Sequence, residues 1–219
     1  MHLIIIITNY GIHQRISQRM DRAYSPVDSL LEQAACIVRR KKEATATLEP
    51  AESYKRGQIE ELISFANSNN LWISPSELNI EFLSKGGENE VYTGDKDDIV
   101  AKLNNFEYAG DDLENFFIRI SAHNLFFCNV PYHMIGFAYN SEHEFCAVLI
   151  QPYIIAEREA TEDEIAEYMK ALGFEMDYID EFHNEQYEVF DAVPNNVLYG
   201  IDGHLYFIDT QIRLRSQSY

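Results

Sequence analysis

The sequence predicts an α+β fold with antiparallel strands, and three observations lead to this prediction. Short β-like runs separated by glycine-bearing or acidic turns begin at Ile80. Segments in which apolar residues recur at helical spacing lie before, between and after these runs. Near the C-terminus, the pair Asp202-Gly203 separates two further β-like runs, Val197 to Tyr199 and His204 to Ile208, which is a strong hairpin signal.

Composition sets the first limits on function. The chain has 219 residues, 46% of them hydrophobic and 13% aromatic, which is enough for a packed core. The formal charge is −19, and it is unevenly spread: residues 1–50 hold seven Lys or Arg against five Asp or Glu, whereas residues 51–219 hold ten against thirty-one. Because the acidic part repels phosphate backbones, we expect no nucleic acid partner.

The expected location follows from cysteines and hydropathy. Cys36, Cys128 and Cys146 are far apart and form no C-x-x-C pair, which favours reduced thiols over a disulfide framework or a zinc site. The apolar run Leu3 to Ile7 lacks a cationic region before it and a cleavage site after it, so it indicates a buried strand rather than a signal peptide. No apolar stretch is long enough to span a bilayer. We expect a cytoplasmic protein without a membrane partner.

Residues 1–56 form a predicted N-terminal extension that is partly helical. Apolar residues from Val27 to Arg40 have helical spacing, and the basic run Arg39 to Lys42 follows. This run is either a helix end with solvated charges or a contact surface for a protein partner. Glu43 to Lys55 has the composition of a linker.

A domain over residues 57–219 begins with a helix from Gln58 to Asn67 and continues with strands. The runs Ile80 to Leu83 and Ile99 to Leu103 flank a glycine-bearing turn and a second strand that ends at Tyr92. Backbone N–H groups of such a turn can bind phosphates, because glycine lets the backbone approach closely. An ordinary glycine hairpin is the alternative. Gly86 and Gly87 form this turn, and Asn89 and Val91 follow it on the second strand.

Lys102 lies on an otherwise apolar strand, directly after Ala101. A lysine there either contacts nucleotide phosphates or points to water from an edge strand. The next predicted helix, Asp111 to Asn124, is capped by Asp111 or Asp112. If Lys102 contacts phosphates, a carboxylate near the next helix is expected to form an ion pair with it. Glu114 is the preferred partner and Glu107 the second. The alternative for Glu114 is that an acidic residue in the first turn suits the helix dipole.

The chain then returns to strands before its last predicted helix. Met134 to Tyr139 and Phe145 to Ile150 are expected to be strands, and the second leads into Gln151-Pro152-Tyr153. Pro152 has no N–H, so Gln151 and Tyr153 are the expected hydrogen-bonding positions of this segment. Thr161 to Leu172 should be a helix with a capping box formed by Thr161 and Glu164. A strand from Tyr187 to Phe190 follows it.

Three polar residues surround the C-terminal hairpin. Asp191 and Asn196 precede its first strand, and Asp209 follows its second, so we expect all three to gather at one end. A carboxylate that orients a hydroxyl, with an amide and a second carboxylate that hold a metal ion, is what phosphoryl transfer requires. The alternative is that Asp and Asn are simply favoured turn residues.

The order of these elements and several short motifs resemble a known family, the small Ser/Thr/Tyr kinase-like domain found in polyvalent proteins of phages and other mobile elements. The resemblance covers roughly residues 57–212 and lies in Gly-Gly-Glu-Asn-Glu-Val-Tyr (86–92), Ala122-His-Asn124, Ile135-Gly-Phe137, Leu149-Ile-Gln-Pro-Tyr153, Leu172-Gly-Phe174, Pro194-Asn-Asn-Val-Leu198 and Phe207-Ile-Asp209. It implies a reduced two-lobed protein-kinase-like fold. The implied parts are an antiparallel β N-lobe over about 57–150, a hinge at 151–153, and a small, mostly helical C-lobe at 154–219 truncated after the metal-binding Asp.

The resemblance also implies a role for each candidate residue, with ATP and Mg2+ as cofactors. Asp191, Lys102 and Glu114 would be catalytic, Asp191 as the base, and Asn196 and Asp209 would be metal ligands. The implied nucleotide-binding residues are Gly86, Gly87, Asn89, Val91, Ala101, Lys102, Gln151 and Tyr153.

Departures from the wider kinase pattern leave two functions open. Val189-Phe190 stands where eukaryotic kinases have His-Arg, Thr210-Gln211 follows Asp209 in place of Phe-Gly, and the chain ends ten residues later, where no activation segment is expected. The first hypothesis is a phosphotransferase that moves the γ-phosphate of ATP to a hydroxyl of a protein or small molecule. The alternative is an inactive nucleotide-binding pseudokinase or interaction module, such as a toxin–antitoxin or phage-defence component.

Overall fold

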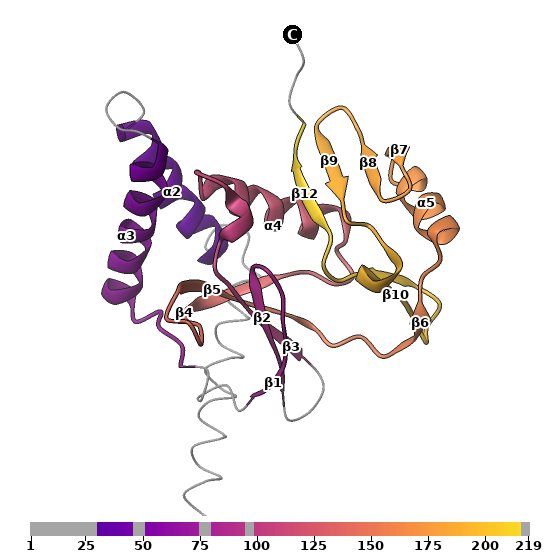
Figure 1. Cartoon of the computed structure of the whole chain (residues 1–219), viewed down its shortest axis with the longest axis horizontal. Coiled ribbons are helices and arrows are strands. Elements are labelled where there is room, and N and C mark those ends of the chain that lie inside the picture. Colours follow the sequence, from indigo (N-terminus) through magenta and orange to yellow (C-terminus); the bar gives the residue numbers. More distant parts are fainter. Residues whose placement is uncertain (1–29, 46–50, 75–79, 95–98, 216–219) are drawn as a thin grey trace, which may run out of the picture. The chain divides into compact units, whose positions relative to one another are not determined.

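A computed structural model describes residues 30–45, 51–74, 80–94 and 99–215, so the Leu3 to Ile7 run lies outside the described residues. The described chain consists of helices and antiparallel strands, in agreement with the α+β prediction (Figure 1). It forms two compact units. Unit 1 comprises Met1–Phe117 and His133–Gln151, and unit 2 comprises Ile118–Tyr132 and Pro152–Tyr219.

Two helices, α2 (Leu30–Thr45) and α3 (Ala51–Asn69), lie side by side in unit 1 (Figure 1). The linker predicted from Glu43 to Lys55 is wrong, because α2 continues to Thr45 and α3 has already begun at Ala51. The expected boundary between residues 56 and 57 therefore falls inside α3. Good helix formers and mutual burial extend both helices. The buried apolar side chains of the two helices include Ala34, Val38, Leu62 and Ala66.

The predicted strands of unit 1 form one five-stranded sheet. Its order is β1-β2-β3-β5-β4, with β1 at Ile80–Lys85, β2 at Asn89–Gly94, β3 at Ile99–Asn104, β4 at His133–Tyr139 and β5 at Phe145–Pro152. Trp72 adds a parallel bridge to Phe137. The strands bury the apolar cluster Ile73, Ala101, Leu103, Ile135, Ala138, Cys146, Val148 and Ile150.

The helix predicted from Asp111 to Asn124 is α4 (Glu114–Phe126), and it follows a short 3-10 turn, η2 (Glu107–Ala109). Asp112 caps its first turn, because the Asp112 Oδ1 accepts a hydrogen bond of 2.9 Å from the backbone N–H of Glu114. Of the two caps proposed from the sequence, the structure shows this role for Asp112.

Unit 2 contains the helix α5 (Glu162–Ala171), which has the predicted capping box of Thr161 and Glu164. The expected hairpin is also confirmed as β10 (Val197–Gly200) and β11 (Leu205–Phe207), and Gly203 has φ +80° in its turn. The predicted strand at Tyr187–Phe190 is β9. The hairpin is extended into a sheet of order β11-β10-β6 by β6 (Ala156–Glu159).

The expectation of a mostly helical C-lobe is wrong, because the described residues after Pro152 hold one α-helix, α5, and seven strands. Four strands of unit 2 were not predicted from the sequence. They are β6, β7 (Glu175–Tyr178), β8 (Glu181–His183) and β12 (Gln211–Leu214), the last three of which join β9 in a sheet of order β12-β9-β8-β7. Every residue of β6 and β7 is exposed, and each strand contains two acidic residues, which are depleted in strands. Strand pairing, rather than a buried face, therefore fixes their conformation.

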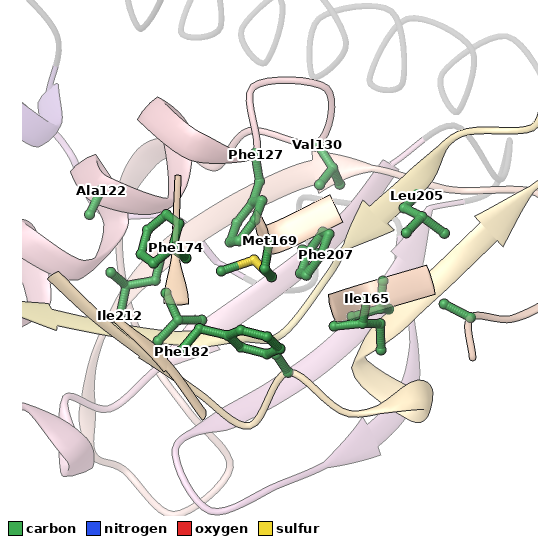
Figure 2. Packing of buried hydrophobic residues seen from close by; sticks show 14 residues of the cluster. Ala122, Phe127, Val130, Ile165, Met169, Phe174, Phe182, Leu205, Phe207 and Ile212 are labelled. Carbon is green, nitrogen blue, oxygen red and sulfur yellow. The ribbon is translucent and has the colours of Figure 1, made fainter. Parts of the chain in front are cut away.

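The core of unit 2 is formed by side chains from α4, α5 and the strands, among them Ala122, Ile165 and Phe207 (Figure 2). The rings of Phe127 and Phe207 stack with their centroids 4.1 Å apart, and Met169 lies beside them. Aromatic pairs of this kind add stability beyond the apolar area that they bury. This packing fixes β11 and thereby the segment that leads to Asp209.

The three cysteines are free, as predicted. None of the helices within the described ranges combines the length and the apolar character needed to cross a bilayer.

Candidate functional site

Asp191 and Asn196 are joined in unit 2 by a hydrogen bond. Asp191 directly follows β9 and has φ +58°, a left-handed conformation that is uncommon for residues other than glycine but is tolerated best by Asn and Asp. The chain then forms the 3-10 turn η3 (Pro194–Asn196). The Asn196 Nδ2 donates to the Asp191 carbonyl oxygen at 3.0 Å. The Asn196 Oδ1 accepts a hydrogen bond of 3.4 Å from the Asn195 Nδ2 and keeps a second lone pair that could bind a ligand.

The hairpin brings Asp209 to the same place. Val197 pairs with Phe207, and the backbone N–H of Ile208 donates to the carbonyl oxygen of Asn196 at 2.9 Å. Asn196 and Asp209 therefore flank the open end of one antiparallel pair. In unit 2 the backbones of Asn196 and Asp209 thus lie at one end of the hairpin, and the Asn196 amide links this end to Asp191. A shared metal site at this end stays a prediction.

A chain of polar contacts supports the residue before Asp209. The Tyr132 hydroxyl donates to the carbonyl oxygen of Ile208 at 3.0 Å. Tyr132 is held in turn by Asn124, whose Nδ2 donates to the Tyr132 carbonyl at 2.8 Å and whose Oδ1 accepts from the Tyr132 N–H at 2.7 Å. Asn124 ends the Ala122-His-Asn124 motif, so this motif supports the segment of Asp209 from α4.

The donor atoms at this end of the hairpin suit magnesium. Asn196 and Asp209 offer oxygen ligands, and Mg2+ prefers oxygen and is commonly held by one or two protein carboxylates together with substrate phosphates and water. In the described part of the chain, no group of three or more His, Cys, Asp or Glu side chains could hold a metal ion by itself. A second observation favours a polar ligand here: the Thr210 hydroxyl, next to Asp209, is buried and has no hydrogen-bond partner among the described residues.

The glycine turn lies in unit 1 between β1 and β2. The Gly86 N–H donates to the Asn89 carbonyl at 2.8 Å, which closes the turn. Gly87 is packed against the Tyr108 phenol, since an added Cβ would lie 2.9 Å from the Tyr108 Cζ. Tyr108 is 59% exposed, so its ring can move. The turn can present backbone N–H groups to an anion once the ring shifts.

Asn89, which is among the residues expected to bind nucleotide, has a structural role. Its side chain is buried, and its Oδ1 accepts from the Asn104 Nδ2 at 2.9 Å. The Asn104 Oδ1 in turn accepts from the Phe106 N–H at 3.0 Å. The Asn89 side chain therefore ties the turn to the end of β3.

The lysine strand is buried. Lys102 is opposite Val91 and Ala101 is opposite Tyr92 in the β2–β3 ladder, and Lys102 is only 6% exposed. An edge lysine that points to water would be far more exposed, so burial favours the functional interpretation. The expected convergence of Lys102 with Asn196 and Asp209 stays a prediction.

The pairing proposed between Glu114 and Lys102 needs correction. The Glu114 Oε1 accepts from the Arg39 Nε at 2.9 Å, and its Oε2 accepts from the Lys42 Nζ at 2.7 Å. Burial works to raise the pKa of the Glu114 carboxyl, but these two cations outweigh it and lower the pKa below its usual value. Within the described residues, the side-chain partners of Glu114 thus come from α2. Glu107, the second candidate, lies in η2 and is exposed.

The basic run Arg39 to Lys42, which lies in α2, therefore forms ion pairs within the protein. Lys42 also contacts the Asp112 Oδ2 at 2.8 Å, and Lys41 lies 3.7 Å from the Glu61 carboxylate. Two of the charges expected in solvent or on a partner surface instead hold α2 to the start of α4.

The segment that would contact adenine spans the end of β5. Gln151 is buried at 3% exposure, and Tyr153, just beyond the strand, is 40% exposed. Sequence reasoning missed the supporting residues Asn104, Tyr108, Tyr132 and Arg119, the last of which donates to the Gln211 side chain. Of these residues, only Tyr132 lies near a motif that the sequence analysis identified, since Asn124 of Ala122-His-Asn124 holds it.

Comparison with known proteins agrees with this geometry. A search of curated proteins found no match. The family model for the serine/threonine/tyrosine kinase found in polyvalent proteins matches residues 55–216, which include the glycine turn, Lys102, Asp191, Asn196 and Asp209. The chain therefore belongs to the family of serine/threonine/tyrosine kinases found in polyvalent proteins.

Proposed function

We propose that this chain is an ATP- and magnesium-dependent phosphotransferase that transfers the γ-phosphate to a hydroxyl group of a protein or a small molecule. The observation that carries the proposal is the joining of Asp191, Asn196 and Asp209 at one end of the β10–β11 hairpin, in a chain of a kinase family. Catalysis of this kind depends mainly on positioning and on charge neutralisation.

Each residue then has a defined task. Asp191 orients the acceptor hydroxyl and accepts its proton, and Asn196 and Asp209 hold the magnesium ion. When bound, magnesium neutralises charge on the phosphates. The tasks in unit 1 are phosphate binding by Lys102 and by the turn of Gly86 and Gly87, in which the Gly87 N–H would donate while the Gly86 N–H stays bonded to Asn89. The backbone of Gln151 and Tyr153 would bind adenine.

A thermal-shift experiment tests nucleotide binding. ATP with Mg2+ should raise the melting temperature of the wild type, and ATP with EDTA should not, because the ion links the phosphates to Asn196 and Asp209. Asp209→Asn should abolish the shift, whereas the matched control Glu185→Gln, at an exposed position in the same unit, should retain it. A wild type without any shift would contradict nucleotide binding.

Phosphate transfer separates the enzyme from an inactive binding module. The second candidate is a pseudokinase, and it is favoured by the two apolar residues that stand before Asp191 in place of the His-Arg pair of eukaryotic kinases. Val189 is fully buried, and the Arg213 guanidinium covers the Phe190 ring at 4.2 Å. With the wild type, labelled ATP should transfer its label to the protein itself or to an added acceptor. Asp191→Asn should transfer none. This variant should keep its fold, because Asn tolerates the left-handed backbone conformation. Binding without any transfer, across protein and small-molecule acceptors, would favour the pseudokinase.

A further inference from the structure

The hydroxyl group of Thr210 is an exception in this fold. Thr210 is only 5% exposed, and its Oγ1 is fully buried with no hydrogen-bond partner in the described part of the chain. Native structures keep few such groups, because a buried donor or acceptor without a partner costs roughly 1–3 kcal/mol. A hydroxyl that destabilises the protein calls for an explanation in terms of a ligand.

The position of Thr210 supplies that explanation. Gln211 is opposite Phe190 and Ile212 is opposite Val189 in the antiparallel β9–β12 pair. Continued by one residue, this register brings Thr210 opposite Asp191 at the point where both strands end. Thr210 is also the residue after Asp209. It therefore lies between the two carboxylate residues of the site, in sequence beside one and across the sheet from the other.

Neighbouring contacts hold this junction in place. Arg119 of α4 donates to the side chain of Gln211, and the Asn196 amide donates to the carbonyl of Asp191. Gln211, which follows Thr210, and Asp191, which lies across the strand pair from it, are thus both held by side-chain contacts. A hydroxyl can donate one hydrogen bond and accept two, and magnesium in protein sites usually keeps several water molecules.

We propose that Thr210 is a further residue of the magnesium site, where its hydroxyl binds a water molecule of the hydrated ion held by Asn196 and Asp209. This inference rests on the proposed function. The hydroxyl lacks a partner when the ion is absent and gains one when the ion is bound. Thr210 thereby stabilises the magnesium-loaded protein relative to the ion-free protein.

The test compares Thr210→Val, which has the same shape without the hydroxyl, with Thr210→Ser, which keeps it. Magnesium is titrated at a fixed concentration of a non-hydrolysable ATP analogue, and the thermal shift is followed. Thr210→Val should raise the half-saturating magnesium concentration roughly five- to tenfold, the effect of one hydrogen bond. Thr210→Ser should stay within about twofold of the wild type by the same reasoning.

Stability without magnesium gives a second readout. Thr210→Val should unfold at the same or a higher urea concentration than the wild type, because it removes a buried hydroxyl that has no partner. A lower midpoint would contradict this, since it would mean that the hydroxyl is satisfied in the ion-free protein. Thr210→Ala serves as a further variant without the hydroxyl, should valine fail to fold.

The outcomes are distinguishable. If the wild type gives no magnesium-dependent shift, the proposed function fails and this inference fails with it. If the wild type gives the shift and Thr210→Val has the same magnesium dependence, only the role of Thr210 is overturned. A weakened magnesium dependence in Thr210→Val that is restored in Thr210→Ser supports it.

Discussion

The Gln58 amide bridges to Asp112 across 54 residues of sequence: its Nε2 lies 2.9 Å from the Asp112 Oδ1. The same fully buried side chain accepts a hydrogen bond from the Leu113 N–H through its Oε1, at 2.9 Å. Gln58 belongs to α3, and Asp112 caps α4. One side chain thus satisfies both a carboxylate and a backbone donor at the start of α4.

Gln58→Ala is expected to destabilise the protein by about 2–3 kcal/mol, because it leaves the Leu113 N–H without its partner and opens a cavity. Urea unfolding followed by circular dichroism would measure this as a lower midpoint. The control Gln186→Ala, at an exposed position in unit 2, should change the midpoint very little. Equal midpoints for the two variants would show that the bridge adds no stability.

The ion pairs between α2 and α4 predict a response to acid. Burial works to raise the pKa of the Asp112 and Glu114 carboxyls, but the hydrogen bonds from Gln58, Lys42 and Arg39 outweigh it, and both pKa values fall below 3.8 and 4.5, respectively. As the pH falls, these two carboxyls therefore bind protons in the unfolded chain before they do so in the folded protein. The stabilisation is fully present above the unfolded pKa values and is lost as the pH falls through the lowered folded ones.

Lys42→Ala should accordingly lose stability at pH 7, by up to about 1 kcal/mol because the pair is partly exposed, and should depend less on pH in the acid range. Urea midpoints measured at pH 7 and at several values below 4.5, the usual pKa of Glu, would show the two curves converging as the pH falls. Arg40→Ala, exposed on the same helix, provides the control. Parallel curves for wild type and Lys42→Ala would contradict a role for this cation in the acid response.

The sequence predicted the elements that carry an apolar run or a local turn or capping signal, and missed short strands that have neither. The strands that contain Ala101 and Val148 carry apolar runs, and the Thr161–Glu164 capping box and the Asp202-Gly203 turn are local signals. By contrast, β6 is an exposed strand of the sequence Ala-Glu-Arg-Glu, whose only reason to be extended is its pairing with β10. No local pattern records that partner.

The same distinction applies to the candidate site. Asp191, Asn196 and Asp209 could be found because the hairpin between them has its own signal. The partners of Glu114 could not, since Arg39 and Lys42 lie more than 70 positions away and long-range ion pairs leave no periodic trace. Thr210 was visible only as a departure from a motif. Its buried hydroxyl became evident from the packing around it.

Gly136 explains part of the Ile135-Gly-Phe137 motif in structural terms. A Cβ at this position would collide with the backbone oxygen of Leu71, which accepts the Phe137 N–H at 2.9 Å, and would lie 2.7 Å from the Ile73 Cδ1. Gly136→Ala is therefore expected to cost about 1–3 kcal/mol, because the backbone must shift. Gly86→Ala is the matched control, since its Cβ would meet only the Asn89 carbonyl, at 3.9 Å.

Differential scanning calorimetry of the two glycine variants would separate these expectations. A lower melting temperature for Gly136→Ala together with a wild-type value for Gly86→Ala supports the close approach. If Gly136→Ala melts with the wild type, Leu71 does not restrict this position.

Tyr132→Phe should weaken magnesium-dependent nucleotide binding without unfolding the protein. The variant removes the hydrogen bond to the Ile208 carbonyl, which fixes the segment before Asp209, and about 1 kcal/mol of stability with it. The measurement is the magnesium concentration that gives half of the nucleotide-induced thermal shift. Tyr178→Phe, at a 70% exposed position of the same unit, should match the wild type. A Tyr132→Phe protein with unchanged magnesium dependence would show that Asp209 needs no support from α4.

Asp191 combines a strained backbone with a proposed catalytic role, so a substitution should affect stability and phosphate transfer differently. Glycine adopts φ +58° without strain, and Asp191→Gly is expected to leave the free energy of unfolding unchanged or to raise it by up to about 1 kcal/mol, while phosphate transfer is lost. Asp191→Ala, which gains no such relief, should be less stable than Asp191→Gly. Urea unfolding and transfer of label from ATP, measured on the same preparations, test both effects. An Asp191→Gly protein that is clearly less stable than the wild type would mean that the carboxylate holds the fold together, and would count against its assignment as the base.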